Sequence, residues 1–125
     1  TRPELGGVMT ERPAIGLAVN ERIDDAQLTQ LLLGMEEEGV PCAIRRSAEL
    51  NPLVLAHEAA VASLLGVGLG VSLDYVVVTT EKLPEGRPYL AHLLGTAPED
   101  DRTIGSNAAR LVKRLPLRGL AERSQ

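Results

Sequence analysis

Aromatic residues are almost absent from this chain of 125 residues, which has no Trp, no Phe and two tyrosines, Tyr75 and Tyr89. A core must therefore be built from aliphatic side chains, and with 44% hydrophobic residues the chain has enough of them for one domain. The scarcity of aromatic rings also removes the platforms on which single-stranded nucleic acids stack. Because the net charge is −4, phosphate binding by clustered cations is disfavoured as well. We therefore expect no nucleic-acid partner.

Cysteine and histidine are too sparse for a metal centre or a nucleophilic site. Cys42 is the single cysteine, so an internal disulfide is excluded, and we interpret it as a small buried hydrophobe inside an apolar run. His57 and His92 stand far apart, and neither has a His or Cys neighbour at metal-ligand spacing. No set of nucleophile, base and orienting group can be assembled from these residues.

Long hydrophobic runs are also missing. No stretch reaches the roughly 18 apolar residues of a transmembrane helix, and the N-terminus has no signal-peptide core, so we expect a soluble intracellular protein without a membrane partner. The longest candidate, residues 61–73, is interrupted by Gly66, Gly68 and Gly70. A dinucleotide-binding loop would need glycine in place of Val71. We interpret these glycines as a helix stop followed by a strand packed closely against a neighbour. A P-loop motif is absent too.

The first half of the chain begins with the pattern of a strand and a helix. Residues 14–19 form a continuous apolar run, typical of a strand covered on both faces. Asp24 and Asp25 then offer an N-cap and a negative first turn to a helix. Gly39 and Pro41 end that helix, because glycine accepts the left-handed position after the last turn and proline cannot continue.

A second strand and helix follow. Residues 42–46 are expected to form a short strand at a sheet edge, since it begins after proline and ends in charge. Asn51 and Pro52 start a helix that we expect to run to about Leu65 and to stop at Gly66. Its predicted inward residues are Leu53, Ala56, Ala60, Val61 and Leu64.

The second half is richer in strands. The expected elements are an antiparallel pair at residues 67–73 and 75–80, a loop at 84–88, a last strand at 89–94 and a loop at 97–102. A third helix is predicted to start near Ser106 and to end before Pro116. The basic residues of this region are interpreted as a solvated helix face; they are Arg110, Lys113, Arg114 and Arg118.

The order β-α-β-α-β-β-β-α, with crossovers first and hairpins later, predicts the fold class. We expect an α/β protein, a three-layer α/β/α single domain with a mixed, mostly parallel five-stranded sheet. The domain is expected at residues 14–120, between a flexible N-terminal arm at 1–13 and a C-terminal tail at 121–125.

Three consecutive glutamates, residues 36–38, stand in the last helical turn, where the negative end of the helix dipole disfavours them. On a helical wheel, at about 100° per residue, Glu37 points away from the apolar stripe of Leu28, Leu31, Leu32 and Met35. One interpretation is a solvated polar face. The other is a functional site, where a cation or a basic partner compensates the charge. The residues alone leave both interpretations open.

Two blocks carry a resemblance to a known family. Residues 33–41, LGMEEEGVP, resemble the pattern LGIEEEGIPF, and residues 103–118, TIGSNAARLVKRLPLR, resemble NTGNNAARLVKGIPFR. Both patterns belong to the small (beta) subunits of diol and glycerol dehydratase reactivating factors, and KLP at residues 82–84 resembles that family's KNLP. The chain departs at Cys42 and Leu117, where phenylalanine is expected, at Ser106 for asparagine and at Arg114 for glycine.

The resemblance implies a fold similar to the medium subunit of the coenzyme B12-dependent dehydratase, and a non-catalytic role. It implies a chaperone-like α2β2 factor that releases damaged cobalamin from inactivated diol or glycerol dehydratase by subunit exchange. The large subunit would be the ATPase and would alone bind ATP or ADP, with Mg²⁺ shared between the subunits. The protein would be cytoplasmic; association with a bacterial microcompartment and the identity of the client are left open.

The resemblance also implies roles for individual residues. Glu37 corresponds to a glutamate that reaches a metal ion held mainly by the large subunit. The expected partner-binding residues are Glu36, Glu38, Asn107, Arg110 and Lys113. The alternatives are the medium subunit of the dehydratase itself and a free-standing metal- or ligand-binding α/β domain.

Overall fold

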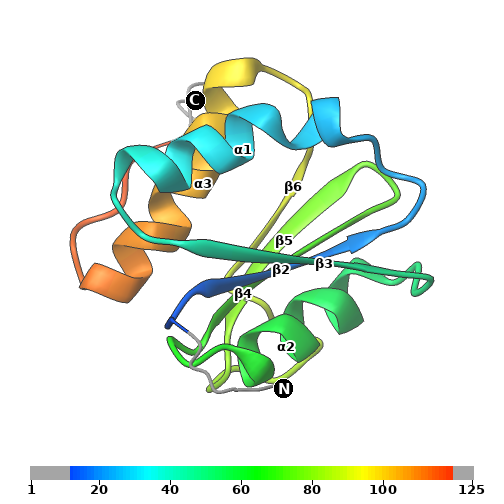
Figure 1. Cartoon of the computed structure of the whole chain (residues 1–125), viewed down its shortest axis with the longest axis horizontal. Coiled ribbons are helices and arrows are strands. Elements are labelled where there is room, and N and C mark those ends of the chain that lie inside the picture. Colours follow the sequence, from blue (N-terminus) through cyan, green and yellow to red (C-terminus); the bar gives the residue numbers. More distant parts are fainter. Residues whose placement is uncertain (1–11, 120–125) are drawn as a thin grey trace, which may run out of the picture.

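The computed structural model describes residues 12–119, so residues 1–11 of the expected arm and all of the expected tail lie outside the described part. Three layers are visible in Figure 1, with helices on both faces of one sheet, as the element order predicted. The elements are, in order, β2 (Ile15–Asn20), α1 (Asp25–Glu37), β3 (Cys42–Ser47), α2 (Pro52–Ala62), β4 (Val67–Ser72), β5 (Tyr75–Thr80), β6 (Leu90–Leu93) and α3 (Pro98–Lys113).

The five-stranded sheet has the order β3-β2-β4-β5-β6. β2 pairs in parallel with β3 and β4, and β5 pairs antiparallel with β4 and β6. β5 therefore runs against the other four strands, which confirms the mixed sheet. β3 lies at an edge, as expected from its composition.

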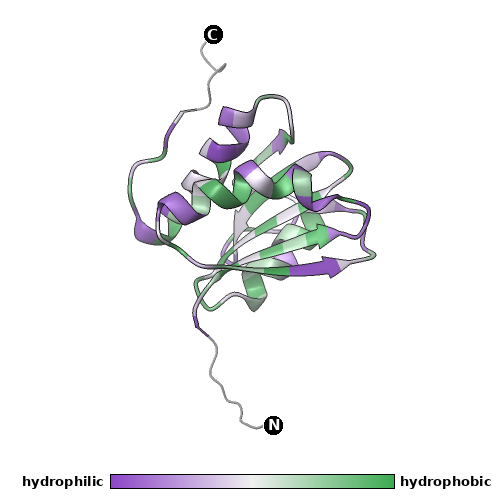
Figure 2. Cartoon of the chain, turned by 45° about the horizontal axis from the view of Figure 1, so that its top comes forward, coloured by the Kyte–Doolittle hydropathy of each residue, from purple (hydrophilic) through white to green (hydrophobic). Residues whose placement is uncertain are grey.

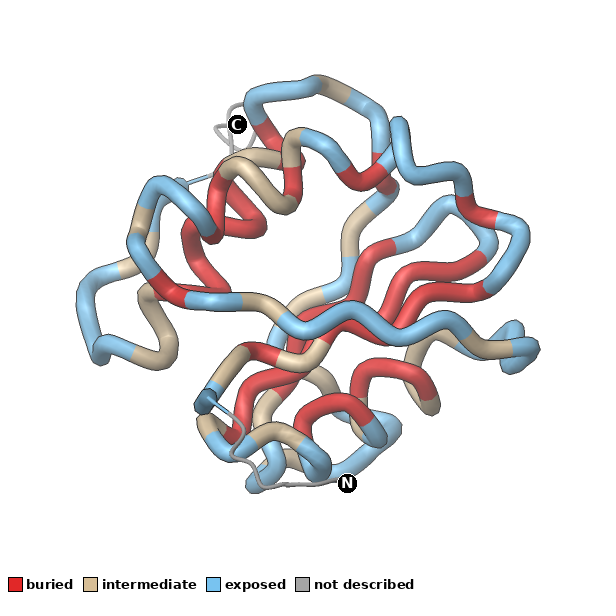
Figure 3. Tube along the Cα trace, viewed as in Figure 1, coloured by how far each residue is buried: buried red, intermediate tan, exposed pale blue. Residues whose placement is uncertain are grey.

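The main core fills the space between the sheet and the pair α1 and α3. Its members are aliphatic and lie on the central strands and the two helices, where Figure 3 shows the longest buried stretches. Figure 2 shows the same division, with hydrophobic residues on the strands and hydrophilic ones on the outer turns. None of the helices within residues 12–119 is both long and apolar enough to span a membrane.

α2 covers the opposite face and packs on a sheet surface made of glycine. A Cβ atom added at Gly68 would lie 2.2 Å from the Ala60 nitrogen, and one at Gly70 would lie 2.4 Å from the Pro52 carbonyl oxygen. Such distances leave no room for a side chain, so only glycine permits the helix to approach this closely. The prediction of a strand packed closely against a neighbour is confirmed.

The predicted inner face and end of α2 were partly wrong. The helix ends at Ala62, and Val61 and Leu64 are 58% and 70% exposed. The buried residues are Leu55, Ala56, Ala59 and Ala60. Because this helix is apolar on nearly every side, hydrophobic spacing could not select its inner face. The small alanines that fit against glycine select it instead.

α1 begins and ends as its sequence predicted. At its start the Asp24 N–H donates to Gln27 Oε1 at 3.0 Å, which is one half of a capping box. At its end Gly39 takes a φ of 77°, its N–H bonds the Glu36 carbonyl, and the Val40 N–H bonds the Met35 carbonyl. This is the Schellman arrangement, and it places the three glutamates in and just after the last turn.

α3 is longer than predicted. It begins at Pro98, whereas we expected a loop at residues 97–102 and a start near Ser106. Proline at the first helical position and three acidic residues in the first turn, Glu99, Asp100 and Asp101, favour a helix start here. The predicted end is confirmed, with Arg114 in the left-handed conformation after Lys113.

Candidate functional site

The acidic end of α1 meets α3 where the two helices approach most closely. A Cβ atom at Gly34 would lie 2.0 Å from the Arg102 carbonyl oxygen, and one at Gly105 would lie 2.0 Å from the Leu31 carbonyl oxygen. One glycine on each helix therefore allows backbone to pack on backbone. This contact brings the cationic side chains of α3 to the glutamates of α1.

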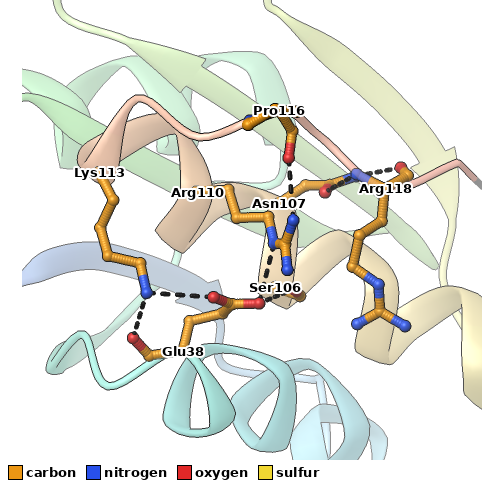
Figure 4. Close-up of polar contacts among 7 residues, drawn as sticks. All are labelled: Glu38, Ser106, Asn107, Arg110, Lys113, Pro116 and Arg118. Atoms are coloured by element: carbon orange, nitrogen blue, oxygen red, sulfur yellow. Dashed lines mark hydrogen bonds and ion pairs between the residues drawn. The ribbon is translucent and has the colours of Figure 1, made fainter.

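Glu38 is the most enclosed member of the acid run, with a side chain 13% exposed. It accepts hydrogen bonds from Ser106 Oγ at 2.7 Å, Arg110 Nε at 2.9 Å and Lys113 Nζ at 3.1 Å, as Figure 4 shows. Lys113 Nζ also donates to the Glu38 carbonyl oxygen at 2.7 Å. Hydrogen bonds from Ser106, Arg110 and Lys113 lower the pKa of Glu38 to about 2. The unfavourable charge at the helix end is thus compensated within the chain.

The same face of α3 holds the segment that follows the helix. Asn107 Nδ2 donates to the Arg118 carbonyl oxygen at 2.8 Å, and the Arg118 N–H donates to Asn107 Oδ1 at 2.7 Å. Arg110 Nη1 donates to the Pro116 carbonyl oxygen at 3.0 Å (Figure 4). Lys113 is exposed, as the interpretation as a solvated helix face expected, whereas Arg110 is partly buried, and both side chains also bind groups of this chain. Their part in partner binding stays a prediction.

Glu37 and Glu36 are exposed, in contrast to Glu38. The Glu37 side chain is 48% exposed and, within residues 12–119, accepts one hydrogen bond, from Arg102 Nη1 at 3.2 Å. Arg102 Nε in turn donates to Gln30 Oε1 at 3.1 Å. The Glu36 side chain has no hydrogen bond or ion pair with any residue from 12 to 119, and its backbone carbonyl accepts the Gly39 N–H. The structure therefore separates the run into one enclosed, one singly bonded and one unpaired carboxylate.

Sequence reasoning missed Arg102 as a neighbour of Glu37. That residue fell in the stretch interpreted as a loop, so no helical register could be assigned to it. The helix-start signal at Pro98 and the acidic first turn would have placed Arg102 on α3.

The remaining candidates carry no visible catalytic arrangement within the described residues. Burial raises the pKa of the Cys42 thiol to about 11, which disfavours the reactive thiolate. His92 Nε2 lies 3.9 Å from Asp100 Oδ2, and Asp101 accepts the Gly95 N–H. Across residues 12–119, no group of three His, Cys, Asp or Glu side chains could hold a metal ion. A metal at Glu37 would need its other ligands from elsewhere.

Comparison with known proteins connects this geometry to a family. A family model of the dehydratase medium subunit matches residues 12–118. The chain is 41% identical over 88 residues to the propanediol dehydratase-reactivating factor small subunit of Citrobacter freundii. This match covers 70% of the present chain and 76% of the Citrobacter chain. It is 35% identical over 108 residues to the diol dehydratase-reactivating factor small subunit of Klebsiella michiganensis, covering 86% of each chain.

A solved structure has the same fold. The diol dehydratase-reactivating factor complexed with ADP and Mg²⁺ contains a chain that superposes with a TM-score of 0.82 at 34% identity. The match covers 87% of this chain and 100% of that chain.

Proposed function

The chain belongs to the dehydratase medium-subunit family, among the small subunits of diol and glycerol dehydratase-reactivating factors, and from this membership we propose how it works. It is the non-catalytic partner in a chaperone-like factor that renews the cobalamin of an inactivated dehydratase. The observation that carries this proposal is the match along 100% of a reactivating-factor chain. The likeness thus extends over the whole domain and not over an isolated motif.

The division of labour follows from what this chain offers. It has no phosphate-binding P-loop, so nucleotide binding and ATP hydrolysis are assigned to the large subunit of an α2β2 complex. The small subunit shares its fold family with the dehydratase medium subunit and can therefore compete for the same docking surface. Release of the small subunit would then let the large subunit bind the inactivated dehydratase and loosen its damaged cobalamin.

The Glu37 carboxylate is suited to supply one ligand to a metal ion that the large subunit holds. Mg²⁺ prefers carboxylate oxygens, the Glu37 side chain is 48% exposed, and only its Oε2 accepts a hydrogen bond from the described residues. Its Oε1 can therefore face a partner. When bound, the ion supplies positive charge between the two subunits, while this chain supplies the carboxylate. The exposed Glu36 and the α3 face around Arg110 and Lys113 would give register to the contact.

The alternative functions, a medium subunit of the dehydratase or a free-standing binding domain, predict different partners from those of a reactivating-factor subunit. A dehydratase subunit would co-purify with catalytic dehydratase chains, and a free-standing binding domain would co-purify with neither. Complete coverage of the reactivating-factor chain favours the small subunit over both.

Subunit exchange can be followed directly. The complex of this chain with its large subunit is mixed with cobalamin-inactivated dehydratase and analysed by size exclusion under Mg-ATP and under Mg-ADP. ATP is expected to release this chain and ADP to retain it, and omission of the dehydratase is the control. Cobalamin release without any release of this chain would contradict the exchange mechanism. Failure to bind the large subunit in every condition would contradict the assignment itself.

A further inference from the structure

Arg102 on α3 connects the proposed metal ligand to the rest of the fold. We propose that Arg102 is a positioning residue, which holds the Glu37 carboxylate in the orientation that meets the metal ion of the large subunit. This inference rests on the proposed function. Arg102 would be a second residue of this chain at the intersubunit contact. It would contact the metal ligand Glu37 and not the metal ion itself.

The contacts form a short chain that starts in the core. The Arg102 backbone is fixed by the close helix crossing, where its carbonyl oxygen lies against Gly34. Its Nε donates to Gln30 Oε1 at 3.1 Å, which aims the guanidinium, and its Nη1 donates to Glu37 Oε2 at 3.2 Å. Gln30 and Glu37 lie two helical turns apart on the same side of α1. Two nitrogens of the rigid Arg102 guanidinium bond the ends of both side chains.

This arrangement restrains one carboxylate oxygen and leaves the other available. Glu37 Oε2 is engaged by Arg102, whereas Oε1 accepts no hydrogen bond from residues 12–119. A free glutamate at a helix end would lose side-chain freedom when it binds a metal, and Arg102 removes part of that loss in advance. Groups that hydrogen-bond a metal-ligating carboxylate commonly orient it in this way.

The exposure of the pair predicts where its effect will be seen. The side chains of Arg102 and Glu37 are 40% and 48% exposed, so solvent screens their attraction and the pair contributes little to folding. Loss of Arg102 should therefore change the metal dependence of assembly and not the stability of the chain.

The test measures the Mg²⁺ concentration that gives half-maximal complex between this chain and its large subunit, with ADP present, by fluorescence anisotropy. R102Q should raise that concentration about threefold to tenfold, which is at or below the low end for outer partners of metal ligands because this pair is exposed. Q30M, which does not touch Glu37, should raise it less, and Q30M combined with R102Q should be no worse than R102Q. R102K keeps the charge but loses the fork, so it should fall between R102Q and wild type. E58Q is the matched control, because Glu58 is an exposed glutamate on α2, on the opposite face of the sheet.

The outcomes separate this inference from the proposed function. If E37Q weakens Mg²⁺-dependent assembly but R102Q and Q30M do not, Glu37 is the ligand and Arg102 has no positioning role. If R102K equals wild type, charge alone suffices and the positioning role is wrong. If E37Q has no effect, the metal role of Glu37 is wrong and the inference falls with it. An unchanged melting temperature in R102Q is required, because a drop would assign Arg102 to folding.

Discussion

Glu37 and Glu38 are neighbours in sequence, yet the structure treats them differently. The Glu38 side chain is bonded by three side chains of α3 and is 13% exposed, whereas the Glu37 side chain is 48% exposed and is bonded, among the described residues, by Arg102 alone. Both suffer the same unfavourable helix dipole. Adjacent acidic residues can therefore have different roles. The role of each glutamate depends on which side chains of α3, far away in sequence, contact it.

The helix crossing that creates this difference gives the largest expected effect. Gly105→Ala should lower the free energy of unfolding by about 3 kcal/mol, because overpacking against backbone has no flexible neighbour to absorb it. The added Cβ would lie 2.0 Å from the Leu31 carbonyl oxygen. It would also separate both glutamates from α3. Urea denaturation followed by circular dichroism measures the loss.

Gly86→Ala is the control for that experiment, since a Cβ there meets nothing within 4 Å. It should change the free energy of unfolding by less than about 0.5 kcal/mol. Equal stabilities of the two variants would mean that α1 and α3 do not pack as closely as the structure shows.

A smaller loss of stability is expected when only the enclosed carboxylate of Glu38 is neutralised. Glu38→Gln should lower the melting temperature by about 5 °C, because the neutral amide accepts weaker hydrogen bonds and leaves Arg110 and Lys113 without a counter-charge. Thermal unfolding at pH 7 measures this difference, and Glu36→Gln, which removes an unpaired charge, should leave the melting temperature unchanged.

The stability difference between wild type and Glu38→Gln should depend on pH. The folded pKa of Glu38 is lowered from 4.5 to about 2, so its stabilisation is complete above pH 4.5 and is lost as the pH falls through 2. The gap between wild type and Glu38→Gln should therefore shrink over that window and close near pH 2. A gap that stays constant from pH 7 to pH 2 would show that the Glu38 charge does not stabilise the fold.

Much of the fold could be predicted because its signals are local. The end of α1 at Gly39, the hairpin of β4 and β5, and the glycine-lined strand under α2 all follow from a few adjacent residues. The inner face of α2 could not be predicted from spacing, since its sequence is apolar on nearly every side.

The candidate site could be predicted only in part, for a different reason. The helical wheel directed Glu37 outward, and its side chain is exposed. The partners of Glu38 lie some 70 positions away in sequence, as Arg110 does at a separation of 72. Such contacts depend on the crossing of two helices at Gly34 and Gly105, and no local pattern reports them.

The most direct test compares Glu37→Gln and Glu38→Gln side by side, with melting temperature and Mg²⁺-dependent binding to the large subunit measured on each. Glu37→Gln should have the melting temperature of the wild type, because the change in its free energy of unfolding should be below about 0.5 kcal/mol. It should lose Mg²⁺-dependent binding to the large subunit. Glu38→Gln should lose melting temperature and, at a temperature where it is folded, should keep most of its binding. Equal behaviour of the two variants in both measurements would contradict the proposed division between a metal-binding Glu37 and a structural Glu38.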